Sequence, residues 1–479
     1  MAFKKQAFKG IFWTFTEQLG VKGVGFVVQI LIARLLLPED FGLIAMVAVF
    51  IGLGDLLVDS GLGQSLIRTK KPQQVDFSTV FYLNIISALV IYLLLYFIAP
   101  YVAIFYDSVE LINILRVIAL AIIFGSFSVV QKTILTINMN FKNQMLIQIP
   151  SLFISSIIGL VLAYNDFGVW SIVFMKVLYP FFTSILYWVY SDWRPRLIFD
   201  MDKLKYHYLF GYKLMITHML NAIFNDIYSV LIGKYYSTSI LGFYNRATTF
   251  QRFPTMLVGK SINRVTYPMF TKINGDIDKL KRILKKINKL VIYLFLPLIF
   301  FLIFNAHEII VFLLTDKWSN ITPFFQILCV GALFEPMIYY YGSVINSFGD
   351  SGLVLKISFY SKILTLVGLL LITKIGVYPL VIFQAVCMLF TALVLMYYGG
   401  RKIHYKLVKQ FKEILPELSI SISSSVLIYF LSCWINLDGI YSVIIYLLGF
   451  MVFYIVISEI LKLTTYVFVK KELLTVINK

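Results

Sequence analysis

The amino-acid sequence predicts an all-α integral membrane protein of fourteen transmembrane helices, arranged as two six-helix lobes followed by two further helices. Three observations predict this fold class. Of the 479 residues, 60% are hydrophobic, against about 45–50% in soluble domains. Apolar stretches recur along the whole chain, each close to the roughly 20 residues that a helix needs to cross the hydrocarbon core. The two halves of the chain also resemble each other at an offset of two hundred residues.

The apolar stretches set the expected spans, with boundaries uncertain by about two to four residues. We expect helices at 11–36, 41–66, 78–104, 111–137, 144–164, 168–190, 208–233, 240–268, 288–315, 321–347, 353–374, 377–399, 414–435 and 440–462.

The loops give the expected orientation, because Lys and Arg accumulate on the cytoplasmic side of a membrane. Basic residues gather at the N-terminus and after even-numbered spans, most densely at 272–289 and 401–412. Loops after odd-numbered spans are poorer in cations and carry residues such as Glu39 and Asp40. Only the loop with Asp350, after the tenth span, is uninformative. Both termini are therefore predicted to lie in the cytoplasm, and the first helix is predicted to be an uncleaved span rather than a signal peptide.

The net charge of +18 would also suit a nucleic-acid partner. Here the basic residues lie mostly at the predicted cytoplasmic membrane face, where anionic lipid headgroups attract them. We therefore expect membrane lipids, and no nucleic acid, as the partner of this charge. Residues 276–290 combine basic side chains with apolar ones at helical spacing, which predicts either an amphipathic helix on the inner surface or a cytoplasmic extension of the ninth span.

The three cysteines, Cys329, Cys387 and Cys433, are scattered through apolar spans. Their spacing predicts neither a disulfide framework nor a metal site, and no cofactor is expected.

The internal resemblance is clearest where the first and seventh spans end. Pro38 and Gly42 correspond to Thr238 and Gly242, with a cation, Arg34 or Lys234, at the end of the preceding span. Six spans separate the matching positions, so the repeat predicts two parallel six-helix units with a substrate site between them. The alternative is chance similarity between two apolar sequences. The expected lobes are 1–205 and 206–412, with the last two spans and the tail at 413–479.

Polar side chains inside the spans mark candidate binding residues, because charge at the bilayer centre is costly and usually faces a cavity or a partner. They concentrate in spans one, two, seven and eight, where cations outnumber carboxylates. This excess predicts a cationic cavity for an anionic substrate such as a phosphate or an acidic sugar. The candidates for substrate binding are Lys22, Arg34, Lys213, Asn221, Asn225, Arg252 and Lys260, and those for ion coupling are Glu17, Asp55, Asp59 and Asp226.

Simpler roles stay open for several of these residues. Arg34, near a helix end, could extend its charged group to the membrane surface. Asp55 or Asp59 could serve simply to neutralise a structural cation such as Lys22. His218 is expected to be a packing residue more often than a proton carrier.

Three motifs resemble those of a known family. The run at 33–42 resembles the "A-R-L-L-x-P-x-D-F-G" signature of polysaccharide transporter proteins, and 59–63 and 241–247 are similar to later parts of the same proteins. These are Wzx-type oligosaccharide flippases of the multidrug/oligosaccharidyl-lipid/polysaccharide exporter superfamily. The resemblance implies two six-helix lobes forming a V around a central cavity, with two extra helices.

The resemblance also implies a substrate. It would be an undecaprenyl-pyrophosphate-linked oligosaccharide, moved from the inner to the outer leaflet of the bacterial cytoplasmic membrane, with polysaccharide polymerase or export machinery as further partners. Relatives that flip the peptidoglycan lipid precursor hold its pyrophosphate with cavity arginines and a carboxylate. Lys22, Arg34, Arg252 and Asp55 are the nearest counterparts, and only Arg34 rests on a motif.

Two rival functions remain. One is an ion-coupled multidrug antiporter of the same fold, although cationic drugs favour a cavity rich in carboxylates. The other is a membrane enzyme acting on lipid-linked sugars, although every predicted outer loop is short and no paired catalytic carboxylates, nucleotide loop or metal cluster is present in the sequence. We expect a transporter that is not an enzyme.

Overall fold

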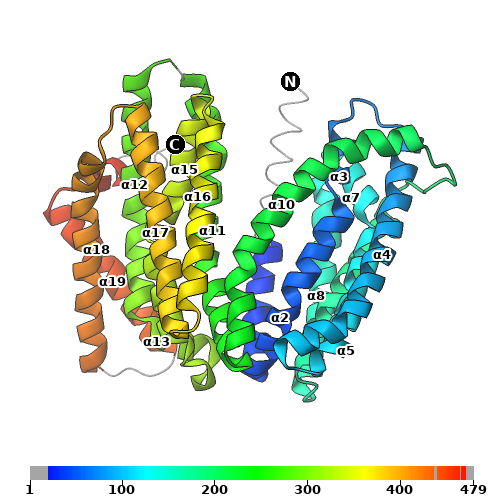
Figure 1. Cartoon of the computed structure of the whole chain (residues 1–479). Coiled ribbons are helices and arrows are strands. Elements are labelled where there is room, and N and C mark those ends of the chain that lie inside the picture. The colour runs from blue at the N-terminus through cyan, green and yellow to red at the C-terminus, as the bar shows by residue number, and fades with distance from the viewer. Residues whose placement is uncertain (1–19, 274, 436–439, 464, 471–479) are drawn as a thin grey trace. The chain divides into compact units, whose positions relative to one another are not determined.

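In a computed structural model, residues 20–273, 275–435, 440–463 and 465–470 are described, and they form helices joined by short loops (Figure 1). Helices arise throughout because only they satisfy backbone hydrogen bonds inside each crossing segment. The chain divides into two compact units between Gly242 and Phe243.

The first unit contains the helical residues 20–35 and then nine labelled helices. They are α2 (Pro38–Asp59), α3 (Leu62–Arg68), α4 (Gln74–Tyr106), α5 (Glu110–Ile118), α6 (Leu120–Ser126), α7 (Val129–Ile137), α8 (Phe141–Tyr164), α9 (Val169–Tyr190) and α10 (Met201–Tyr235).

The helix α11 (Thr238–Ile273) begins in the first unit and continues into the second. The second unit then contains α12 (Ile277–Phe304), α13 (Ala306–Leu314), the short η1 (Asp316–Trp318), α14 (Ile321–Gly331), α15 (Glu335–Ser347), α16 (Ser351–Ile372), α17 (Val377–Lys402), α18 (Leu407–Ile435) and α19 (Ile440–Ile460).

Each predicted span coincides with helix in the described residues, although several spans are broken into shorter helices. Among those residues, eleven helical segments are long and apolar enough to cross a membrane, and the bent stretch from α5 to α7 raises the number to twelve. An all-helical, multi-pass membrane protein is therefore confirmed, whereas the count of fourteen spans stays a prediction.

The boundary between the two compact units follows Gly242 and lies thirty-seven residues beyond the predicted lobe boundary at 205/206. The difference is one helix, α10, which packs against α2, α3 and α4 of the first unit. The six-helix lobes themselves, which rest on the repeat, stay a prediction.

The two copies of the sequence repeat have the same local structure. Helix ends at residue 35 and again at 235, two non-helical residues follow, and helix resumes at Pro38 and at Thr238. Glu39 and Asp40 lie in the first turn of α2, where negative charge is favourable, and the Asp40 carboxylate accepts a hydrogen bond from the Leu37 N–H at 2.9 Å.

The basic stretch at 276–290 belongs to one continuous helix. Asp276 caps the N-terminus of α12, accepting from the Lys279 N–H at 2.9 Å, and the helix runs on to Phe304. The stretch is therefore an extension of the ninth span, the second of the two predicted alternatives.

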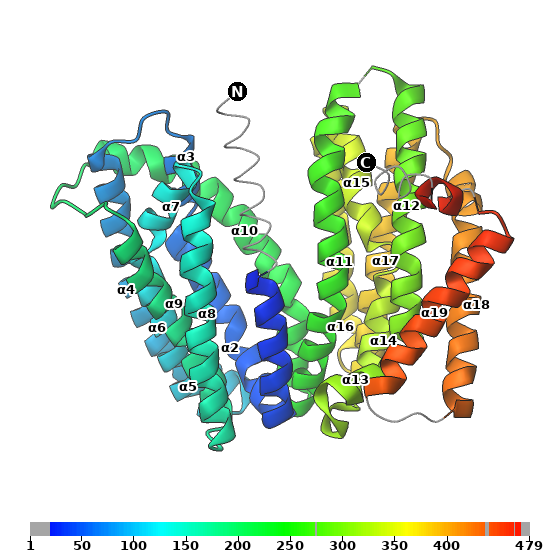
Figure 2. The ribbon, with the colours of Figure 1, turned by 180° about the vertical axis from the view of Figure 1, so that it is seen from behind.

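The last two helices pack on the outside of the second unit, against α12 (Figure 2). The Tyr454 hydroxyl of α19 donates to the Tyr293 carbonyl of α12 at 3.0 Å, and Ile420 of α18 packs beside them. That these two helices lie outside the repeats stays a prediction.

Candidate functional site: a polar cavity in the first unit

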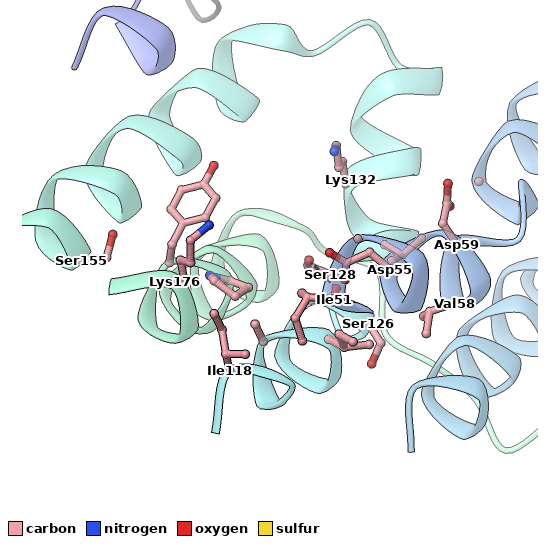
Figure 3. Close-up of a pocket in the computed structure, with 18 of the residues that line it drawn as sticks. Ile51, Asp55, Val58, Asp59, Ile118, Ser126, Ser128, Lys132, Ser155 and Lys176 are labelled. Carbon is pink, nitrogen blue, oxygen red and sulfur yellow. Dashed lines mark hydrogen bonds between the residues drawn. The ribbon is translucent and has the colours of Figure 1, made fainter. Parts of the chain in front are cut away.

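A cavity of about 860 Å³ lies inside the first unit (Figure 3). Its walls come from α2 and α3 on one side and from α5 to α9 on the others. Its volume is within the roughly 300–1,000 Å³ that small-molecule sites usually have. A ligand-sized space therefore exists within one membrane-spanning bundle.

Four charged side chains line this cavity. Asp55 and Asp59 come from α2, one helical turn apart, while Lys132 comes from α7 and Lys176 from α9. All four are solvent-accessible although their helices are strongly apolar. Charged groups in such segments are retained where they line a pathway or pair with one another. The charges balance, so the cavity is polar but carries no net charge.

Hydroxyl groups line the space between the charges. Ser126, Ser128, Thr133 and Ser155 each donate a hydrogen bond to a carbonyl of their own segment, at 2.7 to 3.0 Å. Because the hydrogen of each hydroxyl is engaged, its oxygen is left to accept. The cavity thus offers ammonium donors, carboxylate acceptors and hydroxyl acceptors, a set suited to a ligand rich in hydroxyl groups.

Breaks in the helices shape the cavity. Helix α2 stops at Asp59, Ser60 and Gly61 adopt left-handed backbone angles with φ of 42° and 67°, and α3 starts at Leu62. The break frees backbone N–H groups at the start of α3, and that of Gly63 donates to the Asp59 carboxylate. Irregular backbone inside a membrane protein is tolerated where it lines a cavity.

A second break lies on the opposite wall. The stretch from α5 through α6 meets α7 at an angle of 41°. Ser126 and Ser128 lie at the bend and Lys132 follows one turn into α7, so the bend turns these three side chains to the cavity.

Two of the eleven sequence-predicted site residues, Asp55 and Asp59, are part of this cavity. Lys132 and Lys176 were missed as site residues, because the sequence showed them only as further cations inside spans. In the sequence, each of these lysines is a single cation in an otherwise apolar stretch. The local pattern does not indicate whether such a side chain faces the cavity or the lipid.

The other predicted residues lie elsewhere. Lys213, Asn221 and Asn225 are exposed on α10, Arg34 is exposed and Lys22 and Asp226 are half-buried in the first unit, and Arg252 is exposed on α11 in the second unit. Glu17 and the side chain of Lys260 lie outside the described residues. The grouping of the predicted cations in one cavity stays a prediction.

Arg252 has a buried polar neighbourhood. Glu335 of α15 lies beside it, and the Glu335 carboxylate accepts from the Gln251 Nε2 at 3.2 Å. A carboxylate and a cation therefore meet at the α11–α15 contact within the second unit.

Among the described residues, no group of three or more His, Cys, Asp or Glu side chains could hold a metal ion. The cysteines that are described, Cys329 and Cys387, are buried and unpaired with each other.

Comparison with known proteins gives the family context. A family described as "Polysaccharide biosynthesis protein" matches residues 31–323. The chain is 25% identical to the teichuronic acid biosynthesis protein TuaB of Bacillus subtilis (strain 168) over 324 residues, which are 67% of this chain and 66% of the relative. It is 22% identical to the lipopolysaccharide biosynthesis protein WzxC of Escherichia coli (strain K12), covering 70% of this chain and 68% of that one. The matched region thus spans about two thirds of the length of these relatives.

Solved structures give the fold. The lipid II flippase MurJ in an inward closed conformation matches with a TM-score of 0.72 at 16% identity, covering 95% of this chain and 98% of that chain. An inward-facing multidrug resistance transporter of the MATE family, in the MOP superfamily, matches with a TM-score of 0.61 at 16% identity, covering 80% and 94%. These matches confirm that the fold is similar to that of these two proteins, while the two-lobe layout stays a prediction.

Proposed function

The chain belongs to the polysaccharide biosynthesis protein family, and from this premise we propose that it flips lipid-linked oligosaccharides. The substrate is an undecaprenyl-pyrophosphate-linked repeat unit, moved from the inner to the outer leaflet of the bacterial cytoplasmic membrane for a surface polysaccharide. The names of the relatives, which concern teichuronic acid and lipopolysaccharide biosynthesis, support this reading, as does a fold similar to that of a lipid II flippase.

The observation that carries the proposal is the cavity in the first unit. A hydroxyl-rich sugar needs both donors and acceptors, and the cavity offers two ammonium groups, two carboxylates and several hydroxyl oxygens. Burying such a headgroup in a purely apolar bundle would leave its hydroxyls without partners, at about 1–3 kcal/mol for each group. The cavity removes that cost, so it holds sugar residues of the headgroup.

The pyrophosphate needs a positive site. Because the cavity has no net charge, we assign the pyrophosphate to cations outside it, among Lys22, Arg34, Lys213, Arg252 and Lys260. Asn221 and Asn225 add amide donors. Because these two residues are four positions apart, they lie on the same face of α10. The isoprenoid tail stays in the lipid.

Transport proceeds by alternating access, and no covalent bond is made or broken. Energy from an ion gradient would enter through carboxylates that change charge inside the membrane. Asp55 and Asp59 fit that role because they share a cavity with Lys132 and Lys176, while Glu17 and Asp226 are the other candidates. Polysaccharide polymerase or export machinery receives the product on the outer side, and both termini lie in the cytoplasm.

A multidrug antiporter is the second candidate, favoured by the fold shared with a MATE transporter and by the two carboxylates in the cavity. A cationic drug would have to displace the neighbouring ammonium groups of Lys132 and Lys176, which makes this cavity a poor site for it.

The experiment that separates the two uses purified protein in liposomes. An undecaprenyl-pyrophosphate-linked oligosaccharide is incorporated, and its exposure on the outer leaflet is followed with an added glycosidase. Lipid in the inner leaflet is protected from the glycosidase. The flippase proposal predicts that this protected lipid becomes exposed only when the protein is present. If the protein moves no such lipid but exports ethidium from the same vesicles under a proton gradient, the result would contradict the flippase proposal and support the antiporter.

A further inference from the structure

We propose that the second unit binds a monovalent metal cation, such as Na⁺, at the buried carboxylate of Glu417, where α12, α18 and α19 pack against one another (Figure 2). This site is separate from the cavity of the first unit, and it stands whether or not the chain flips lipid-linked glycans. It rests on a carboxylate oxygen that has no partner in an apolar surrounding and on neighbouring hydroxyl oxygens that are left to accept.

The Glu417 carboxylate is buried with one of its two oxygens unused. The residue is 2% exposed. Its Oε1 accepts a hydrogen bond from the Thr465 Oγ1 at 2.7 Å, whereas Oε2 has no hydrogen-bond partner among the described residues. No Lys, Arg or His in the described part of the chain forms an ion pair with it. A carboxylate buried without a positive partner is strongly unfavourable, so this group requires a compensating charge.

The surrounding of this carboxylate is apolar. Tyr293 of α12, Ile420 of α18, Tyr454 of α19 and Leu463 form a buried cluster, each at most 9% exposed. The charge of Glu417 acts on both tyrosines of this cluster, whose ring centres lie 5.1 Å apart. Bulk water therefore does not solvate the carboxylate, and the compensating charge has to be bound within the contact.

Two hydroxyl groups beside the carboxylate have their hydrogens engaged elsewhere. The Ser421 Oγ donates to the Glu417 carbonyl at 2.7 Å, and the Tyr454 hydroxyl donates to the Tyr293 carbonyl at 3.0 Å. These two hydroxyl groups lie close to each other. Because each hydrogen is already used, both oxygens are left to accept. Together with Oε2 they form a set of oxygen ligands without a donor.

This set of oxygens indicates the class of ligand. Carboxylate and hydroxyl oxygens suit hard metal cations. One carboxylate balances one positive charge, whereas a divalent ion would leave an uncompensated charge in an apolar surrounding.

A proton on Oε2 is the alternative compensating charge. Within the described residues, no hydroxyl group lies within hydrogen-bond distance of Oε2. A metal ion accommodates that separation, because it holds its oxygen ligands about 2.3–2.6 Å from itself and farther from one another. The spacing therefore favours a metal ion.

Thermal unfolding of the purified protein in detergent tests the site without any glycan. The concentration of NaCl is raised from about 1 to about 300 mM while N-methyl-D-glucamine chloride keeps the ionic strength constant. A ligand that binds only the folded state raises the melting temperature, and we expect a rise of about 2 °C or more. KCl and CaCl₂ are compared in the same way, and CaCl₂ should not replace NaCl.

Glu417→Gln should abolish the dependence on sodium. The matched control is Glu413→Gln, one turn earlier on the same helix, because Glu413 already pairs with Lys285 at 2.7 Å. This control should keep the full dependence on sodium. Equal dependence in the wild type and in Glu417→Gln would overturn the proposal. A melting temperature that ignores Na⁺ and K⁺ but rises on acidification, in the wild type and not in Glu417→Gln, would assign the carboxylate to a proton instead.

A second measurement decides the question if Glu417→Gln does not fold. Binding of radioactive Na⁺ is followed by equilibrium dialysis of the wild type and of Ser421→Ala, which keeps the carboxylate and removes one ligand oxygen. The affinity for sodium should fall roughly tenfold in Ser421→Ala, which corresponds to the loss of one modest interaction. Unchanged binding in Ser421→Ala, or no bound sodium in the wild type, would contradict the site.

Discussion

Gly42 of α2 lies directly against the backbone carbonyl group of Thr238, the first residue of α11. The contact is reciprocal, because Gly242 lies in the same way against the carbonyl group of Pro38, the first residue of α2. The four residues are the equivalent positions of the sequence repeat. The repeat therefore brings its own two copies together, with no side chain between the backbones.

Gly42→Ala should destabilise the protein. The added methyl group would overlap the Thr238 carbonyl, which belongs to the backbone and has little freedom to move. We expect a loss of about 1–3 kcal/mol or more, the usual cost of overpacking. The matched control is Gly52→Ala on the same helix, where a Cβ meets nothing within 4 Å. Thermal unfolding in detergent compares the two, and equal stability of both variants would contradict the contact.

Asp76→Asn should cost far more stability than Asp107→Asn. Asp76 is buried and serves His207, Lys203 and the Gln73 N–H, and hydrogen bonds to charged groups contribute about 1.5–3 kcal/mol each. Asp107 is 79% exposed and pairs with Lys234 near the surface, so its loss should cost less than about 1 kcal/mol. Thermal unfolding of both variants measures the difference, and the reverse order would contradict a stabilising role for the buried contacts of Asp76.

The Asp350–Lys402 pair should give a pH-dependent contribution to stability. Asp350 precedes α16 and accepts a hydrogen bond from the Lys402 ammonium at 2.7 Å, which lowers the pKa of its carboxyl group. A lowered pKa in the folded state stabilises the protein above the unfolded value of about 3.9, and the benefit disappears as the pH falls through the folded value.

The variant Asp350→Asn should therefore melt slightly below the wild type near neutral pH, and the gap should close as the pH falls through the lowered pKa of the folded protein. Because the side chain is 37% exposed and solvent screens the pair, the difference should be small. A gap between the two melting temperatures that widens on acidification would contradict the assignment.

Hydropathy and loop charge were enough to place the helices, because the membrane imposes the length and polarity of each span. The repeat at Pro38 and Thr238 was also visible, since both copies need the same break between helices. The internal breaks were not predicted: 111–137 was expected as one span and is three helices. No proline occurs in that stretch. Its bend follows Gly125 and Ser126, and the Ser128 hydroxyl donates to the Gly125 carbonyl at 2.9 Å, a Gly/Ser signal that a hydropathy pattern does not contain.

The same limit applies to the site. Asp55 and Asp59 could be singled out because two carboxylates one turn apart are unusual in an apolar helix. The inward direction of Lys132 and Lys176 depends on the bend before α7 and on how α9 packs, and a hydropathy pattern contains neither of these features. The packing of α10 against α4 includes the pairing of His207 with Asp76, residues 131 positions apart, which no local pattern shows.

The most direct test of the central claim asks whether the cavity of the first unit serves flipping. Asp55→Asn and Lys176→Gln, each of which leaves the cavity with an unbalanced charge, are compared with Arg116→Gln, outside the cavity, in the liposome assay. We expect both cavity variants to expose the lipid-linked oligosaccharide at least tenfold more slowly, with unchanged folding, and the control to match the wild type. Wild-type rates for both cavity variants would contradict the account.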